Sequence, residues 1–223
     1  MKKILPTVSF CLVFILTSYF ILTSYSAPKD FMGMKKGEVE FQSINIFDAT
    51  VIYPYPTWFK SGLIGNAKNN QKGPLFSTTQ IPTGQTFKDW NEKYTINAIY
   101  GKYQKNLDLN KFMSYSIAKL MNQCKKEDME GKALLNKKND LMMVIYCGKY
   151  SNNSKKGEIG IFRYTKYKDT YFNISQRWKV DSFNVKNINS VPLKKLGITQ
   201  ANFNKATEEI MKASFSESLR PVN

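Results

Sequence analysis

The side chains of this chain that could hold a charged group are concentrated between residues 163 and 179. Cations and tyrosines recur there within one predicted hairpin, and the candidate ligand-binding residues are Arg163, Lys166, Lys168, Tyr171, Arg177 and Lys179. Arginine and lysine beside tyrosine can hold phosphate or carboxylate groups. The alternative is that these side chains form the ordinary solvated face of a two-stranded ribbon. Both interpretations stay open at the level of sequence.

Acid–base catalysis has few candidate residues, because the chain has no histidine. Ser–His and Cys–His nucleophile pairs and histidine-based zinc sites are therefore excluded. Paired carboxylates can hydrolyse a substrate, and the acids to consider are Glu38 with Glu40, Glu127 with Asp128 and Glu130, Glu208 with Glu209, and Asp48 alone. The paired acids lie in polar stretches typical of exposed surface. We predict no catalytic residue, no metal site and no cofactor, with a histidine-free, carboxylate-dependent hydrolase as an alternative.

Cys124 and Cys147 are expected to join a helix to a strand. Asp108 is a suitable N-cap, and apolar residues then recur every three or four positions as far as Cys124, which predicts a helix over about 108–125. Leu141 to Cys147 is an unbroken apolar run, typical of a strand covered on both faces. A disulfide between them would enclose 22 residues and contribute about 3 kcal/mol. Two unpaired buried thiols are the alternative, and export of the chain would decide between the two.

Residues 1–26 have the three parts of a secretory signal peptide. Lys2 and Lys3 precede an apolar stretch over 4–22, and small residues lie before Ala27 at the expected cleavage point. The apolar stretch is long enough to span a membrane, so an uncleaved inner-membrane anchor over 4–22 is the alternative. We expect export to the periplasm or the extracellular space.

The chain carries a formal net charge of +16, and removal of Lys2 and Lys3 with the signal would leave +14. Such a balance favours an anionic partner. After export, we expect this partner to be an anionic envelope component or a protein rather than nucleic acid. Membrane association is expected if the N-terminal segment stays attached. The alternative is that the scattered lysines only keep the protein soluble.

The pattern of apolar residues predicts a single secreted α+β domain over 27–223. In it an antiparallel sheet packs on the helix at about 108–125 and on a C-terminal helix at about 200–214, for which Thr199 is a plausible cap. Glycines, prolines and polar clusters predict a long loop over about 59–87.

A hairpin is predicted from two strands over 158–165 and 170–180. On its second strand Phe172, Ile174 and Trp178 would face the core, and the alternate residues would face water. The residues between the central helix and the strand at 141–147 are polar and predict a connection without strands.

One series of residues resembles a known group of proteins. The series is Thr86-Phe-Lys-Asp-Trp-Asn-Glu92, the helix ending in Cys124, the strand ending in Cys147, Gly157-Glu158 and the stretch from Tyr171 to Lys179. Over about 84–180 the chain thereby resembles small secreted bacterial proteins that have a cysteine-bearing helix and a cysteine-bearing strand. The order of strands around one helix is also similar to the Mog1/PsbP-like α+β fold. The resemblance implies a fold and a compartment but no activity.

Taken together, these patterns predict an exported, disulfide-bonded, non-catalytic protein that binds a partner in the bacterial envelope or outside the cell. A membrane-tethered accessory subunit of an envelope assembly is the alternative that follows if residues 4–22 remain as an anchor.

Overall fold

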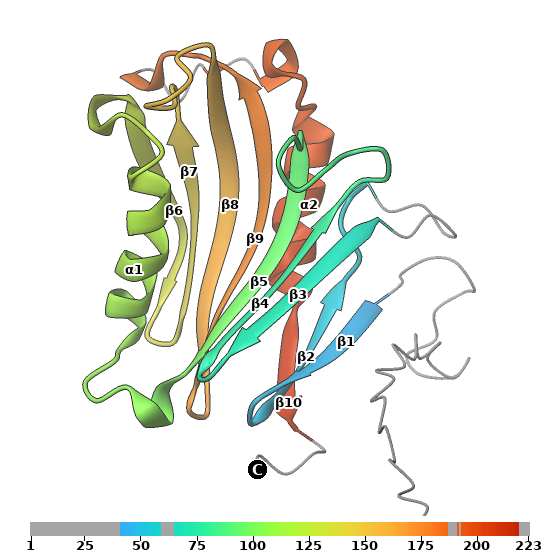
Figure 1. Ribbon diagram of the computed structural model, residues 1–223, viewed down its shortest axis with the longest axis vertical. Coiled ribbons are helices and arrows are strands. Elements are labelled where there is room, and N and C mark those ends of the chain that lie inside the picture. Colours follow the sequence, from blue (N-terminus) through green and yellow to red (C-terminus); the bar gives the residue numbers. More distant parts are fainter. Residues whose placement is uncertain (1–40, 59–64, 187–190, 192, 219–223) are drawn as a thin grey trace, which may run out of the picture.

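Two antiparallel sheets form the framework of the residues that the computed structural model describes, which are 41–58, 65–186, 191 and 193–218. The larger sheet has seven strands in the order β3-β4-β5-β9-β8-β7-β6 (Figure 1). Its strands are β3 (Asn66–Lys72), β4 (Leu75–Ile81), β5 (Glu92–Tyr100), β6 (Met129–Lys137), β7 (Asp140–Cys147), β8 (Lys156–Tyr167) and β9 (Thr170–Asp181). The predicted hairpin is confirmed as β8 and β9, and it lies at the centre of this sheet.

The smaller sheet has the order β1-β2-β10, with β1 at Phe41–Ile46, β2 at Ala49–Pro54 and β10 at Ser214–Glu217. It joins the two ends of the described chain, because β10 follows the C-terminal helix and pairs with β2. Stacking of Tyr53 on Tyr94 and of Phe47 on Tyr100 packs this sheet against β5 of the larger one. The described chain is therefore one α+β domain.

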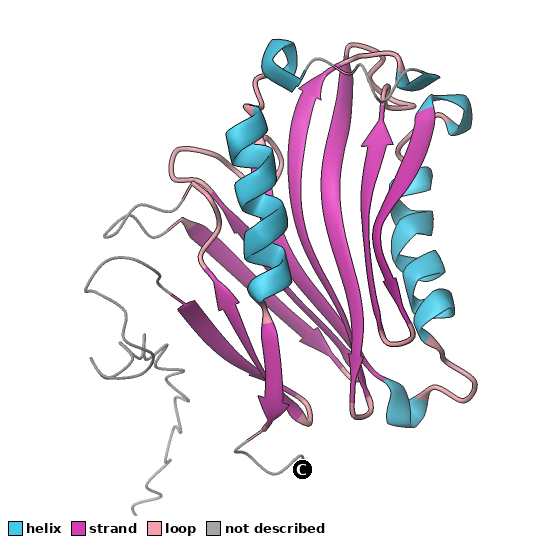
Figure 2. Cartoon of the chain, turned by 180° about the vertical axis from the view of Figure 1, so that it is seen from behind, coloured by secondary structure: helices cyan, strands magenta, loops and turns pink. Residues whose placement is uncertain are grey.

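Two helices pack on opposite faces of the larger sheet (Figures 1 and 2). They are α1 (Leu109–Met121) and α2 (Gln200–Lys212), and short 3₁₀ helices lie at η1 (Gly101–Tyr103), η2 (Lys126–Asp128) and η4 (Leu193–Leu196). Both predicted N-caps are confirmed, because the Asp108 side chain accepts from the Lys111 N–H and the Thr199 side chain accepts from the Asn202 N–H. Within the described residues, no helix is long and apolar enough to cross a membrane.

The central strands are buried on both faces, which corrects the expectation that one face of β9 is in water. On the α2 side, Phe172, Ile174 and Trp178 join the main core as predicted. On the α1 side, Tyr171 is only 4% exposed and packs with Phe112 of the helix. A periodicity of two cannot show this, because polar residues such as Asn173 and Ser175 are buried in the same row.

The disulfide between Cys124 and Cys147 is present, with the two Cα atoms 5.8 Å apart. The helix is shorter than predicted, since α1 ends at Met121 and Cys124 lies beyond it, in a single β-bridge with Tyr150. Both cysteines are buried, so the prediction that they tie the helical segment to a central strand is confirmed.

Two segments expected to be irregular contain strands. The prediction of a loop over 59–87 is wrong where β3 and β4 pair as a hairpin with its turn at Gly73. The prediction of a connection without strands after α1 is wrong where β6 pairs with β7. Both β3 and β6 are edge strands whose side chains are almost entirely exposed. Backbone pairing forms such strands without an alternating apolar pattern. The expected signal peptide at 1–26 lies outside the described residues.

Candidate functional site

The six candidate ligand-binding residues do not form one surface. Arg163 faces α2, whereas Lys166, Tyr171, Arg177 and Lys179 lie on the α1 side of the sheet. Lys168 is in the exposed β8–β9 turn and pairs with Glu217 of β10 at 2.5 Å. The six candidates are therefore divided between the two faces of the sheet and a turn, because side chains alternate between faces along each strand.

Arg163 has a structural role. Its guanidinium donates to both carboxylate oxygens of Asp140 at 2.8 and 3.0 Å. The same group donates to the carbonyl oxygens of Ile210, Met211 and Ala213 at 2.8–3.1 Å. These carbonyls end α2, where unpaired acceptors and the negative end of the helix dipole favour a cation. Arg163 therefore fixes the end of α2 to the sheet.

Arg177 belongs to a buried polar network next to the disulfide. It forms an ion pair with Glu158, which is 1% exposed, and the Tyr150 hydroxyl donates to the second oxygen of Glu158 at 2.6 Å. Burial and the charge of Glu158 raise the pKa of Tyr150 above its ordinary value. Sequence reasoning missed Glu158, because a single acid in a strand gives no sign of burial. The Glu158 carboxylate neutralises the charge of the Arg177 guanidinium, so Arg177 is not free to hold a ligand.

Lys179 is part of a cluster of cations around Trp90. The ammonium nitrogens of Lys93 and Lys179 lie 3.8 and 5.0 Å from the centroid of the Trp90 ring, and the Arg177 guanidinium lies 5.8 Å from it. Trp90 itself is only 8% exposed, so these cations cover its faces. The cluster holds the segment before β5 against the sheet.

The predicted candidates Lys166 and Tyr171 border a pocket of about 420 Å³ at the start of α1. Lys137 and Lys138, from the β6–β7 turn, line it as well. We call it the basic pocket. Its acid is Asp108, whose side chain already accepts from the Lys111 N–H at 2.8 Å.

The basic pocket is shaped by contacts between its walls. The Tyr171 hydroxyl donates to the Leu107 carbonyl at 2.6 Å, and the Lys166 ammonium lies 5.1 Å from the centroid of the Tyr171 ring. The Lys166 N–H donates to the Asn139 carbonyl at 3.1 Å, which fixes the β6–β7 turn beside β8. Sequence reasoning missed Lys137 and Lys138 because the turn was taken for part of an irregular connection.

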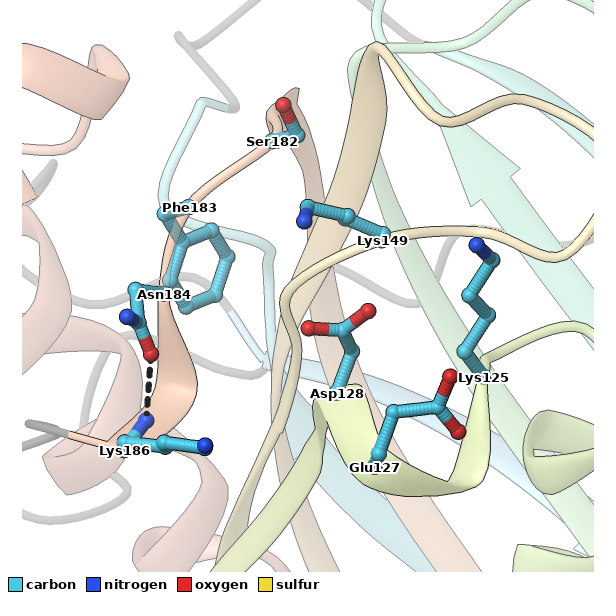
Figure 3. Close-up of a pocket in the computed structure, with 8 residues that line it drawn as sticks. All are labelled: Lys125, Glu127, Asp128, Lys149, Ser182, Phe183, Asn184 and Lys186. Atoms are coloured by element: carbon cyan, nitrogen blue, oxygen red, sulfur yellow. Dashed lines mark hydrogen bonds between the residues drawn. The ribbon is translucent and has the colours of Figure 1, made fainter.

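A second pocket, of about 600 Å³, lies beside the disulfide, and we call it the disulfide pocket (Figure 3). Glu127 and Asp128 of η2 lie in it between Lys125, Lys149 and Lys186. Within the described chain no ion pair joins these five side chains.

The disulfide holds the walls of this pocket together. The Sγ atom of Cys124 lies 3.5 Å from the carbonyl oxygens of Asp128 and Lys149. The Gly148 N–H donates to the Asp128 carbonyl at 2.7 Å, and the Phe183 N–H donates to the Gly148 carbonyl at 3.1 Å. Three segments far apart in sequence therefore meet at this pocket.

Glu92 is the acid whose ionisation the fold changes most clearly. Burial raises its pKa, although hydrogen bonds from Gln176, Trp178 and Thr57 act in the opposite direction. The Gln176 amide donates to a Glu92 oxygen at 2.5 Å. No second carboxylate accompanies it in this hydrogen-bonded group, so the paired-acid geometry of a glycosidase is not formed there.

In the described part of the chain, no three Cys, Asp or Glu side chains are grouped to hold a metal ion.

No protein-family model matches this chain, and no curated protein matches it. Among solved structures, the chain is similar to a point mutant of the protein Mog1 and to the Ran-binding protein Mog1p of Saccharomyces cerevisiae, each with a TM-score of 0.45 and 10% sequence identity. The first match covers 79% of this chain and 95% of the other, and the second covers 80% and 96%. The likeness to Mog1 is one of structure, at low sequence identity.

Proposed function

We propose that this chain is an exported, non-catalytic protein that binds an anionic partner at the basic pocket. The observation that carries the proposal is the meeting of Lys137, Lys138 and Lys166 around one pocket of about 420 Å³. The partner is an anionic envelope component or an acidic surface of another protein. A role in binding nucleic acid is not proposed, because the N-terminal pattern favours export.

The charges of the basic pocket support this proposal. Lys137, Lys138 and Lys166 make no ion pair within the part of the chain that the structure describes. Asp108 is engaged by the helix backbone and faces Lys111 at 4.0 Å. The pocket therefore keeps an excess of positive charge that a phosphate or carboxylate group could neutralise.

The position of the lysines also supports binding of an external partner. Lys137, Lys138 and Lys166 are exposed, and they come from a turn and a strand end that lie next to each other. The strands behind them pair with one another from β6 to β9, with one register shift in β6 between Ala133 and Leu135. A rigid support of this kind keeps the cations in place without a partner, which lowers the entropy lost on binding.

The test compares two adjacent lysine pairs by charge reversal. The pocket variant is Lys137→Glu with Lys138→Glu, and the matched control is Lys194→Glu with Lys195→Glu in η4, at the other end of the long strands (Figure 1). Both variants change the net charge equally, and all four lysines are exposed. The measurement is binding to vesicles of phosphatidylglycerol and to polyphosphate, across a series of salt concentrations.

A lysine near an anionic surface contributes about 1 kcal/mol, so the pocket variant should bind at least about 30-fold more weakly. The control should lose much less, and binding of the wild type should weaken steeply with salt because exposed charges are screened beyond about 10 Å at 0.1 M. An equal loss in both variants would show that only net charge matters. Absence of binding to both probes at low salt would refute the proposal.

The state of the N-terminus separates two forms of the proposal. Mass spectrometry of the protein from its native host should find a chain that begins at Ala27, which is the form of a secreted or periplasmic protein. A chain that still contains Lys2 and Lys3 would instead support the membrane-tethered accessory subunit, with the basic pocket close to the membrane surface.

A carboxylate-dependent hydrolase is the second candidate, and the acids of the disulfide pocket favour it over other enzyme classes. Glu127 and Asp128 both line this pocket, which is large enough for a sugar or a short peptide. Incubation of envelope extract with the protein should then release small products, and Asp128→Asn should abolish the release. Equal release by the variant would exclude these acids.

A further inference from the structure

The face of β3, β4 and β5 that lies on the α1 side of the sheet is built from short polar side chains. Two rows cross these strands in register, Lys68–Thr79–Thr95 and Asn70–Ser77–Asn97. Directly opposed residues in antiparallel strands project from the same face, so the six side chains form one surface, which we call the polar face. They share this side of the sheet with Ile99, which packs against the α1 core.

Within the part of the chain that the structure describes, no helix covers the polar face. In Figure 1, α1 lies over the other end of the sheet, and the smaller sheet packs against β5 through Tyr94 and Tyr100, which belong to the opposite face. Lys68 and Asn70 are exposed, and Ser77, Thr79 and Asn97 are partly exposed.

The hydrogen-bonding groups of the polar face are largely unused by the fold. Asn70 and Ser77 make no side-chain hydrogen bond with any described residue. The contact between the Thr79 and Thr95 hydroxyls and that from the Asn97 amide to Asn173 are both long, at 3.4 Å. The surface therefore presents donors and acceptors that a ligand could engage, with neighbouring side chains within each row about 4.8 Å apart, the spacing of neighbouring strands.

Cations lie at two corners of the polar face. Lys72 follows Lys68 and Asn70 along β3 on the same side, so Lys68 and Lys72 lie at the two ends of its exposed edge. The exposed residues Lys68 and Lys72 form no ion pair within the described chain. The rows between them contain no acid, so the surface is complementary to a ligand that carries both hydroxyl groups and negative charge.

We propose that the polar face binds an acidic polysaccharide, a chain of sugars that carries carboxylate groups. Its vicinal hydroxyls match the amides and hydroxyls of Asn70, Ser77 and Thr79, and its carboxylates match the lysines at the corners. A protein partner would require an aromatic or aliphatic anchor at the centre of the contact. The two rows contain none. The site uses other residues than the basic pocket and is tested separately from it.

The test uses a variant that removes hydrogen-bonding groups and keeps all charges, Asn70→Val with Ser77→Val and Thr79→Val. Valine favours strands, so the fold should persist, and thermal unfolding checks this. Asn69→Val is the matched control, because Asn69 is also exposed on β3 and alternates to the opposite face. If the triple variant is destabilised, the single variant Asn70→Val, at the sheet edge, replaces it in the binding measurements. The probes are polygalacturonate, neutral dextran and polyphosphate.

The wild type should bind polygalacturonate more tightly than dextran, and the triple variant should bind it at least about tenfold more weakly, since each lost hydrogen bond has a measurable effect. Asn70→Val alone should show part of this loss. Asn69→Val should leave binding unchanged, and polyphosphate binding should be equal in all variants. Equal binding of polygalacturonate by wild type and triple variant would overturn the proposal, and so would equal affinity for dextran. Vesicle binding by the Lys137→Glu, Lys138→Glu variant tests the basic pocket and does not bear on the polar face.

Discussion

Replacement of Arg163 by methionine should be among the most destabilising single changes at a charged residue of the β8–β9 hairpin. The Arg163 side chain is 12% exposed and the Asp140 side chain 25% exposed, so the pair is largely shielded from solvent. Loss of one partner from a buried ion pair typically costs about 3–5 kcal/mol. The carbonyl oxygens of Ile210, Met211 and Ala213 also lose a charged donor.

These losses share one side chain and are not additive, so we expect a total of about 4 kcal/mol. For a domain of this size, each kcal/mol lowers Tm by roughly 2–4 °C, which predicts a decrease of about 8–16 °C. The assay is thermal and urea unfolding of the oxidised protein. Lys168→Met is the matched control, because it removes the same charge from an exposed residue of the same hairpin and should leave Tm nearly unchanged.

A double-mutant cycle with Asp140→Asn separates the two roles of Arg163. If the contacts to the end of α2 matter independently, Arg163→Met should remain destabilising in the Asp140→Asn background. A decrease in stability of less than about 1 kcal/mol in the single variant would refute the structural role. The residue would then be free for the ligand-binding role that the sequence suggested.

Two further predictions concern the disulfide and Glu92. Cys124→Ser should lower the free energy of unfolding by about 3 kcal/mol, because the bridge joins cysteines 23 positions apart and the serine hydroxyl would lie in a buried site. Reductant should destabilise the wild type by a similar amount and the variant little. Equal sensitivity of both proteins to reductant would contradict the bridge. Burial raises the pKa of Glu92, so the folded state binds the carboxyl proton more tightly than the unfolded state does. This tighter proton binding stabilises the folded state at low pH. The stabilisation is lost as the pH rises above the ordinary pKa of 4.5. Glu92→Gln should therefore stabilise the protein at pH 7.5 relative to wild type and much less at pH 4, and a difference that does not change with pH would exclude this cause.

The sequence alone determined the elements with strong local patterns. The spacing of apolar residues together with Asp108 and Thr199 placed the starts of both helices correctly. The unbroken apolar run ending at Cys147 identified a strand inside the larger sheet, and the disulfide expected between Cys147 and Cys124 is present. These features depend on neighbouring residues, so they can be read in order along the chain.

Tertiary structure decided which face each hairpin residue occupies and what it contacts. The sequence could not show that both faces of β9 are covered, because the covering helices come from residues before and after the hairpin. It could not reveal β3 and β6 either, since both edge strands are held by backbone pairing with polar side chains outward. For the same reason Arg163 belongs to the end of α2, and Lys166 meets Lys137 and Lys138 only once β6, β7 and β8 have paired. Long-range pairing, not local composition, determines where charges meet.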